Sequence, residues 1–188
     1  MSQGYVAKIG VVGSAIAGLS AALGVAKAGH HATIFGPPPT ALTGALQLAP
    51  NGYQALASLG ALDALTPAIT RLDAIEIRSA RTNSTLSIID HERPQRRDYG
   101  AIGRGALVNG LYQLAKAHPR ISFDEASVQS ITATQEDTSL ITQDTAQHAF
   151  DLIIGADGTN GLTRRIIGAS QTPAPRDRHA LRAACPSS

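Results

Sequence analysis

KIGVVGSAIAGLSAALGVAKAGHHATIF, residues 8–35, is the stretch of sequence that decides the fold. It opens with a short, mostly apolar run, continues through the small residues 13–15 into a helix-like stretch over 16–28, and closes with a second apolar run at 31–35. Strand, tight turn, helix and strand within about 30 residues have the length of one βαβ unit. Strands joined by a helical crossover run parallel. The sequence therefore predicts an α/β fold around a parallel sheet.

The turn between the first predicted strand and the helix has the spacing of a pyrophosphate-binding loop. It reads G-x-A-x-x-G, formed by Gly13, Ser14, Ala15, Ile16, Ala17 and Gly18. A pyrophosphate needs backbone N–H donors at a helix N-terminus and small residues that let the backbone come close. Gly13 suits the tight turn, Ala15 stands where close approach is needed, and Gly18 suits packing of the helix on the strand. We therefore expect a Rossmann-like dinucleotide site; the alternative is that these small residues only pack a helix on a sheet.

Two features depart from the usual dinucleotide fingerprint. Ala15 replaces the second glycine and adds one methyl group beside the phosphates. An acidic residue usually closes the second strand and binds the ribose hydroxyls, and Gly36 stands at that place. Recognition of the ribose therefore has to come from backbone groups or from another part of the chain.

The remaining sequence continues the mixed pattern. The prolines within residues 36–40 predict a loop. Helices are predicted over 51–65, interrupted at Gly60, and over 104–116; strands are predicted over 73–79, 86–90, 121–123, 128–132, 140–142 and 152–154. The two strands around the turn at 82–84 predict a small inserted antiparallel pair. We expect one domain over residues 1–168, with an insertion at 73–97, and a partly ordered tail over 169–188.

Composition limits the possible function classes. The chain has 188 residues, 43% of them hydrophobic, which suits a single globular domain. The 16 basic and 14 acidic residues are spread along the chain, so nothing favours nucleic-acid binding. A lone cysteine, Cys185, suits a reducing, cytoplasmic compartment. The histidines lack metal-ligand spacing and no G-x-S-x-G elbow occurs, so we expect neither a metal site nor an assignable catalytic residue.

The apolar run after Lys8, residues 9–28, also has the outline of a secretory signal peptide. Only one cation precedes it, and its glycines fall where the strand, turn and helix explain them. A membrane-spanning helix needs about 20 apolar residues, and this glycine-interrupted stretch is barely that long. We expect no integral membrane segment, and the signal peptide remains the alternative.

A later stretch, DLIIGADGTNGLTRR at residues 151–165, carries a family resemblance. It resembles the DG motif of the flavin-dependent aromatic hydroxylases, the p-hydroxybenzoate, salicylate and ubiquinone-pathway type. The matching residues are Gly155, Ala156, Asp157, Gly158 and Arg164, with Gly161 where the family usually has serine. Residues 44–65 resemble the family's segment beside the flavin ring, which here includes Gln47. Residues 101–111 resemble the segment whose arginine contacts the cofactor, here Arg104.

This resemblance implies FAD as the cofactor and NAD(P)H with dioxygen as co-substrates for hydroxylating a small aromatic or quinone-precursor ring. The implied cofactor-binding residues are Gly13, Ser14, Ala15, Ile16, Ala17, Gly18, Gln47, Arg104, Asp157, Gly158 and Arg164. The resemblance links Asp157 and Arg164 to binding of the cofactor and of the nicotinamide. Their structural alternatives are that Asp157 caps the following helix, that Arg104 covers a helix surface, and that Gln47 is an ordinary loop residue.

The resemblance also implies a missing half. Family members continue into a further G-D motif, a substrate-covering sheet and C-terminal helices, of which the strands within 73–97 would be the only part here. We expect the N-terminal FAD-binding portion of such an enzyme, weakly active or inactive alone. The alternatives are a non-catalytic Rossmann-like nucleotide-binding module and a related flavin enzyme; the absence of tryptophan argues against a halogenase.

Overall fold

The computed structural model describes residues 5–40, 43–90, 98–134 and 138–168. By its contacts the chain forms two compact units. Of the described residues, 5–40, 108–134 and 138–168 belong to the first unit, and 43–90 and 98–107 belong to the second. The expected tail at 169–188 and most of the charged connection at 91–98 lie outside the described residues.

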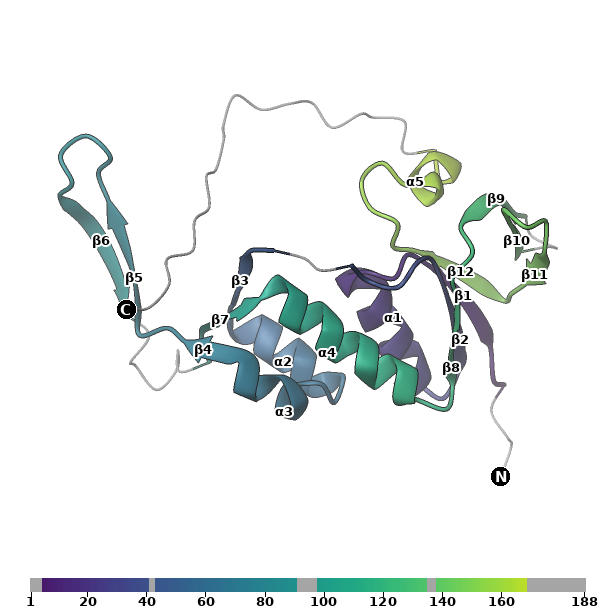
Figure 1. Ribbon diagram of the computed structural model, residues 1–188, viewed down its shortest axis with the longest axis horizontal. Helices are drawn as coiled ribbons and strands as arrows, with labels where there is room; N and C mark the ends of the chain where they lie inside the picture. The colour runs from purple at the N-terminus through teal and green to yellow at the C-terminus, as the bar shows by residue number, and fades with distance from the viewer. Residues whose placement is uncertain (1–4, 41–42, 91–97, 135–137, 169–188) are drawn as a thin grey trace. The chain divides into compact units, whose positions relative to one another are not determined.

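A four-stranded parallel sheet forms the centre of the first unit (Figure 1). Its strands are β1 (Lys8–Val12), β2 (His31–Phe35), β8 (Ile121–Asp124) and β12 (Leu152–Gly155), in the order β12-β1-β2-β8. Val12 pairs with Phe35 on one side and with Gly155 on the other, and Phe35 pairs with Asp124. The carboxyl ends of all four strands therefore lie along one edge of the sheet. The predicted α/β fold with a parallel sheet is confirmed.

Helix α1 (Ile16–Lys27) connects β1 to β2 and packs against both strands. Its buried face repeats at helical spacing and consists of Gly18, Leu19, Ala22, Leu23 and Ala26. The helix gives way to β2 at Gly29, whose φ of +92° lies in the left-handed region that favours glycine. The apolar run considered as a signal peptide thus forms β1, one of the two inner strands of the sheet, and the helix that packs on it. No helix of the described residues is long and apolar enough to span a membrane.

A second, antiparallel sheet lies beside the end of β2. It consists of β9 (Val128–Ala133), β10 (Thr138–Thr142) and β11 (Gln147–Ala149). Leu140 of β10 is fully buried and clusters with Val12 and Phe35. The ring of Phe150 meets the ring of Phe35 edge-on, with 5.7 Å between their centroids. Val128, the first residue of β9, packs against the same cluster, so the start of β9 lies near the carboxyl end of β2.

The strand β12 is joined to the start of the chain by a carboxylate. Asp151 accepts hydrogen bonds from the Tyr5 hydroxyl at 2.5 Å and from the Lys8 backbone N–H at 2.6 Å. The Asp151 N–H in turn donates to the Lys8 carbonyl at 2.9 Å. Hydrogen bonding by Tyr5, followed by that of the Lys8 amide, lowers the pKa of the Asp151 carboxyl.

The second unit contains a three-stranded antiparallel sheet, β3 (Ala45–Leu48), β7 (Gly100–Gly103) and β4 (Ile69–Arg71), in the order β3-β7-β4. Between β3 and β4 lie α2 (Pro50–Ser58), α3 (Leu62–Leu65) and the short 3-10 helix η1 (Thr66–Ala68). The predicted interruption at Gly60 is present, with φ at +73°. The three strands were not predicted, because each has at most four residues and β7 begins and ends with glycine.

The predicted antiparallel pair is also present in the second unit. β5 (Ala74–Arg78) pairs with β6 (Thr85–Asp90), and Asn83 in the connecting turn has φ of +55°. After β7 the chain enters α4 (Arg104–Ala117), which begins at the predicted residue and whose residues from Val108 on belong to the first unit. There Tyr112 packs its ring against Phe123 of β8, with 5.1 Å between the centroids.

Candidate functional site

The glycine-rich turn lies between the ends of β2 and β12. Gly13 has φ of +115°, and its N–H donates to the Phe35 carbonyl at 2.9 Å. A side chain at position 13 would put its Cβ 2.4 Å from the Ala156 carbonyl oxygen. Only glycine fits both this backbone conformation and this space. The turn is therefore held tightly at the carboxyl edge of the parallel sheet.

The other two fingerprint positions explain how α1 starts against this turn. A Cβ at Gly18 would lie 1.7 Å from the Gly13 carbonyl oxygen, so the first turn of α1 sits directly on the loop. Ala15 precedes the helix with φ of −85° and ψ of −172°, an extended conformation open to any residue. Its exposed methyl group causes no backbone strain. Alanine in place of the second glycine is thus compatible with the loop.

The N-terminus of α1 is open to an anion. Ala15 makes no side-chain cap, and the first turn contains no acidic residue. The first intrahelical bond of the segment runs from the Leu19 N–H to the Ala15 carbonyl, so the preceding N–H groups have no helical acceptor. These donors and the positive end of the helix dipole favour a phosphate.

A cavity of about 460 Å³ adjoins this helix end. Its volume lies in the range of small-molecule sites, roughly 300–1,000 Å³. It is lined by Val12, Gly13, Ser14, Ala15, Phe35, Gly36, Pro37, Ser127, Val128, Ala156, Asp157, Gly158 and Leu162. The cavity thus joins the glycine-rich turn, the end of β2, the loop after β8 and the DG turn. Ser127 and Val128 were missed by the sequence reasoning, because only the packing of β9 and β10 brings their loop here.

At the end of β2 the cavity carries hydroxyl and carbonyl groups but no carboxylate. Gly36 has φ of +135°, and its N–H donates to the Asp124 carbonyl at 2.9 Å. A Cβ at position 36 would lie 3.5 Å from the Ser14 hydroxyl oxygen. The Ser14 hydroxyl donates to the carbonyl of Pro37. Ser14 and the backbone of 36–37 therefore form the wall where the usual acidic residue would stand.

The DG turn is organised by Asp157. Its carboxylate accepts the Thr163 N–H at 3.0 Å and also the Thr163 hydroxyl. The N-cap residue of α5 (Leu162–Ile166) is Gly161, which has no side chain to bond the helix, and Thr163 lies in the first turn. Asp157 thus caps this short helix from outside the N-cap position, in line with the structural alternative. A Cβ at Gly161 would lie 2.1 Å from the Asp157 carboxyl carbon. The carboxylate thus fills the space that a serine at position 161 would need, and Thr163 joins the site as a partner that the motif alone did not reveal.

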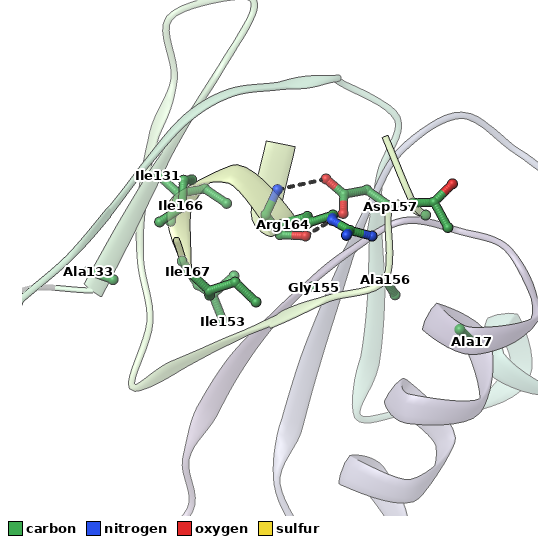
Figure 2. A pocket seen from close by; sticks show the side chains of 13 residues that line it. Ala17, Ile131, Ala133, Ile153, Gly155, Ala156, Asp157, Arg164, Ile166 and Ile167 are labelled. Atoms are coloured by element: carbon green, nitrogen blue, oxygen red, sulfur yellow. Dashed lines mark hydrogen bonds between the residues drawn. The ribbon is translucent and has the colours of Figure 1, made fainter. Parts of the chain in front are cut away.

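A second cavity, of about 550 Å³, lies on the other side of the DG turn (Figure 2). Arg164 and Asp157 line it beside isoleucines of β9, β12 and α5, which are Ile131, Ile153 and Ile166. Ile167 completes this apolar wall and is 79% exposed. Of the glycine-rich motif, Ala17 lines this second cavity, whereas Gly13, Ser14 and Ala15 line the first. The backbone of the turn before α1 therefore faces the first cavity.

Gln47 and Arg104 lie in the second unit. Gln47 is in β3 opposite Ala101 of β7, and its side-chain oxygen accepts the Tyr99 hydroxyl at 3.4 Å. Gln47 is therefore a strand residue and not a loop residue. Arg104 is the first residue of α4, and its backbone N–H donates to the Gly44 carbonyl at 2.9 Å. Both predicted residues thus belong to the paired strands β3 and β7 or directly follow them, at positions three residues apart along the pairing. No cluster of metal-ligating side chains occurs among the residues that the structure describes.

The sequence of this chain is similar to those of known monooxygenases. It is 29% identical over 163 residues to 3-amino-4-hydroxybenzoate 2-monooxygenase PtmB3 of Streptomyces platensis, a match covering 84% of this chain and 41% of the relative. It is 25% identical over 170 residues to the FAD-dependent monooxygenase DEP2 of Fusarium langsethiae, covering 85% and 32%. The homologues of this chain are flavin-dependent monooxygenases. The family resemblance expected from the four motifs is confirmed.

A solved structure of an oxygenase shows the same fold. The tetrameric form of 2-methyl-3-hydroxypyridine-5-carboxylic acid oxygenase superposes with a TM-score of 0.73 at 25% identity, covering 88% of this chain and 43% of that one. No family model matches the sequence. The chain spans about two fifths of the length of the first relatives that it matches. The matches cover more than four fifths of this chain.

Proposed function

We propose that this chain binds FAD through the glycine-rich turn and the cavity beside it. The observation that carries the proposal is the close packing of Gly18 on Gly13 and of Gly13 on Ala156, which leaves the open N-terminus of α1 facing that cavity. These residues fit a pyrophosphate, because they offer backbone donors and no side chain that would block its approach. Gly13, Ala15 and Gly18 would hold the phosphates, with Ser14, Ile16 and Ala17 contributing backbone.

The other predicted contacts have different support. Asp157 and Gly158 line the same cavity as the turn, which supports a role at the cofactor. Arg164 lines the neighbouring apolar cavity, which suits the proposed part in nicotinamide handling. For Gln47 beside the flavin ring and Arg104 near the phosphates, the proposal rests on the family resemblance alone.

For the whole protein we propose NAD(P)H-dependent hydroxylation of a small aromatic or quinone-precursor ring. FAD, when bound, supplies the redox and oxygen chemistry, and the protein supplies binding, orientation and exclusion of water. The relatives named for hydroxybenzoate and hydroxypyridine carboxylic acid substrates support this substrate class. Because the chain spans two fifths of the first relatives, we propose FAD binding for these 188 residues and weak or no turnover by them alone.

Titration of the purified chain with FAD, followed by quenching of flavin fluorescence and by calorimetry, tests the binding proposal. We expect saturable binding with one FAD per chain, and competition by 5′-ADP, which shares the pyrophosphate. Binding of NAD in preference to FAD would favour the non-catalytic nucleotide-binding module instead. Absence of binding to either dinucleotide would overturn the proposed site.

Turnover is tested separately. The chain is loaded with FAD and mixed with NADH or NADPH and a panel of hydroxybenzoates, and absorbance at the nicotinamide band is followed. We expect no substrate-dependent oxidation above the slow background of free flavin. Rapid oxidation that depends on an aromatic substrate would contradict the proposal that these residues alone are weakly active.

A further inference from the structure

The ribose end of the FAD site is defined only through the proposed function, on which any role of a residue there rests. In a dinucleotide fold the acidic residue at the end of the second strand accepts hydrogen bonds from the ribose hydroxyls. Here Gly36 occupies this place. The cavity nevertheless continues past Gly36 to Pro37 and Ser127, so a ribose would still have room at the end of β2.

The side-chain atom nearest to the Cβ position of residue 36 is the hydroxyl oxygen of Ser14. The position that a Cβ of residue 36 would take lies 3.5 Å from the Ser14 hydroxyl oxygen and 3.6 Å from the Ser14 nitrogen. Ser14 is half-buried and lines the cavity. Its oxygen therefore stands where an acidic side chain from the end of β2 would begin.

The hydrogen-bonding state of Ser14 is fixed by Pro37. A carbonyl oxygen can only accept, so in the bond between them the Ser14 hydroxyl must donate its single proton to the Pro37 carbonyl. A hydroxyl oxygen has two acceptor lone pairs, which remain for another partner. With its proton committed, Ser14 offers a ligand only acceptor capacity. This is the same capacity that a carboxylate offers to a ribose.

We propose that the Ser14 hydroxyl oxygen is the ribose acceptor of this site and replaces the missing carboxylate. Ser14 thereby determines specificity for the adenosine ribose of FAD. It receives a hydrogen bond from a 2′- or 3′-hydroxyl while the backbone of the turn and the N-terminus of α1 hold the pyrophosphate. Because the acceptor is neutral, the ribose contact is weaker than one to a charged carboxylate.

A cycle that combines ligand and protein changes tests this role. Dissociation constants of 5′-ADP, 2′-deoxy-ADP and 3′-deoxy-ADP are measured by calorimetry for the wild-type chain and for Ser14→Ala. We expect one deoxy ligand to bind the wild type about five-fold more weakly than 5′-ADP, the size of one neutral hydrogen bond. Ser14→Ala is expected to bind 5′-ADP and that deoxy ligand equally. Ser14→Thr, which keeps the hydroxyl, is expected to restore the difference.

Two results separate failure of this inference from failure of the proposed function. The role of Ser14 is overturned if removal of a ribose hydroxyl weakens ADP binding equally in the wild type and in Ser14→Ala, or weakens it in neither. FAD binding would still stand in that case. Absence of both FAD and 5′-ADP binding by the wild type overturns the site and the inference together. Circular dichroism and thermal unfolding of each variant establish that the comparison is made between folded proteins.

Discussion

The carboxylate of Asp157 accepts the Thr163 N–H at 3.0 Å and the Thr163 hydroxyl as well. The acidic residue of the DG turn therefore stabilises the turn itself, because it caps the helix that follows. If FAD binds as proposed, it meets a carboxylate that these two donors already hold in place. Asp157 thus stabilises the turn and at the same time lines both cavities.

Removing this cap should destabilise the fold. We expect Asp157→Ala to lower the free energy of unfolding by about 1 kcal/mol, the usual cost of losing a helix cap. Thr163→Val, which loses the hydroxyl bond but keeps the N–H bond, should cost less. Urea denaturation followed by circular dichroism measures both. Equal stability of Asp157→Ala and the wild type would contradict the capping role.

A serine at position 161 should disturb the same bonds from the other side. A Cβ there would lie 2.1 Å from the Asp157 carboxyl carbon, so Gly161→Ser must push the carboxylate away from Thr163. We expect a loss of stability close to that of Asp157→Ala. The double variant Asp157→Ala/Gly161→Ser should be about as stable as either single variant, since both remove one interaction. Fully additive losses in urea denaturation would show that the two sites are independent.

Two glycines at the same place in their helices should respond in opposite ways. Gly18 and Gly52 are each the third residue of a helix, α1 and α2. A Cβ would lie 1.7 Å from the Gly13 carbonyl oxygen in the first case and 3.5 Å from a Leu48 methyl carbon in the second. We expect Gly18→Ala to abolish FAD binding and lower the melting temperature. Gly52→Ala should raise stability by up to about 1 kcal/mol; a tolerated Gly18→Ala would refute the close packing.

Acid should weaken the link between β12 and the start of the chain. The pKa of Asp151 is lowered in the folded protein, chiefly by the Tyr5 hydroxyl, so its stabilising effect is complete well above its ordinary value of 3.8 and is lost as pH falls below that value. We expect Asp151→Asn to have a lower free energy of unfolding than the wild type at pH 7. Between pH 5 and pH 3 the free energy of unfolding should then fall less in Asp151→Asn than in the wild type.

Tyr5→Phe is the matched control for this pH effect. It removes the largest cause of the lowered pKa but leaves the Lys8 amide as a donor to Asp151. Its pH dependence in urea denaturation should therefore lie between those of the wild type and Asp151→Asn. Identical acid sensitivity of all three proteins would disprove the contribution of this carboxylate.

The parts of the fold that could be predicted are those set by neighbouring residues. The strand, turn and helix of residues 8–35 follow from local apolar runs and small residues, and Gly29 and Gly60 interrupt the helices as expected. The sheet of β3, β7 and β4 was missed because its strands are too short to show a period. A glycine of this sheet is also required by tertiary packing, because a Cβ at Gly100 would lie 2.5 Å from the Tyr53 hydroxyl oxygen. No local sequence pattern can reveal such a contact.

The candidate site divides in the same way. Gly13 and Gly18 could be recognised from spacing, because the turn demands them within one short segment. Ser127 and Val128 reach the cavity only through the packing of a distant sheet, and the bond from Asp157 to Thr163 depends on the path of the turn. The absence of an acidic residue at Gly36 was evident in the sequence. The hydroxyl of Ser14 beside that place became evident only in the structure.

The position of β12 affects how the purified chain would behave. Among the described residues β12 is one of the two outermost strands of the parallel sheet, paired on one side with β1, and Leu152 is 51% exposed. An apolar edge strand presents unpaired N–H and C=O groups that can pair with a strand of another molecule. Concentration-dependent aggregation along this edge would then compete with ligand binding. Dilute protein and a light-scattering check should therefore accompany every titration.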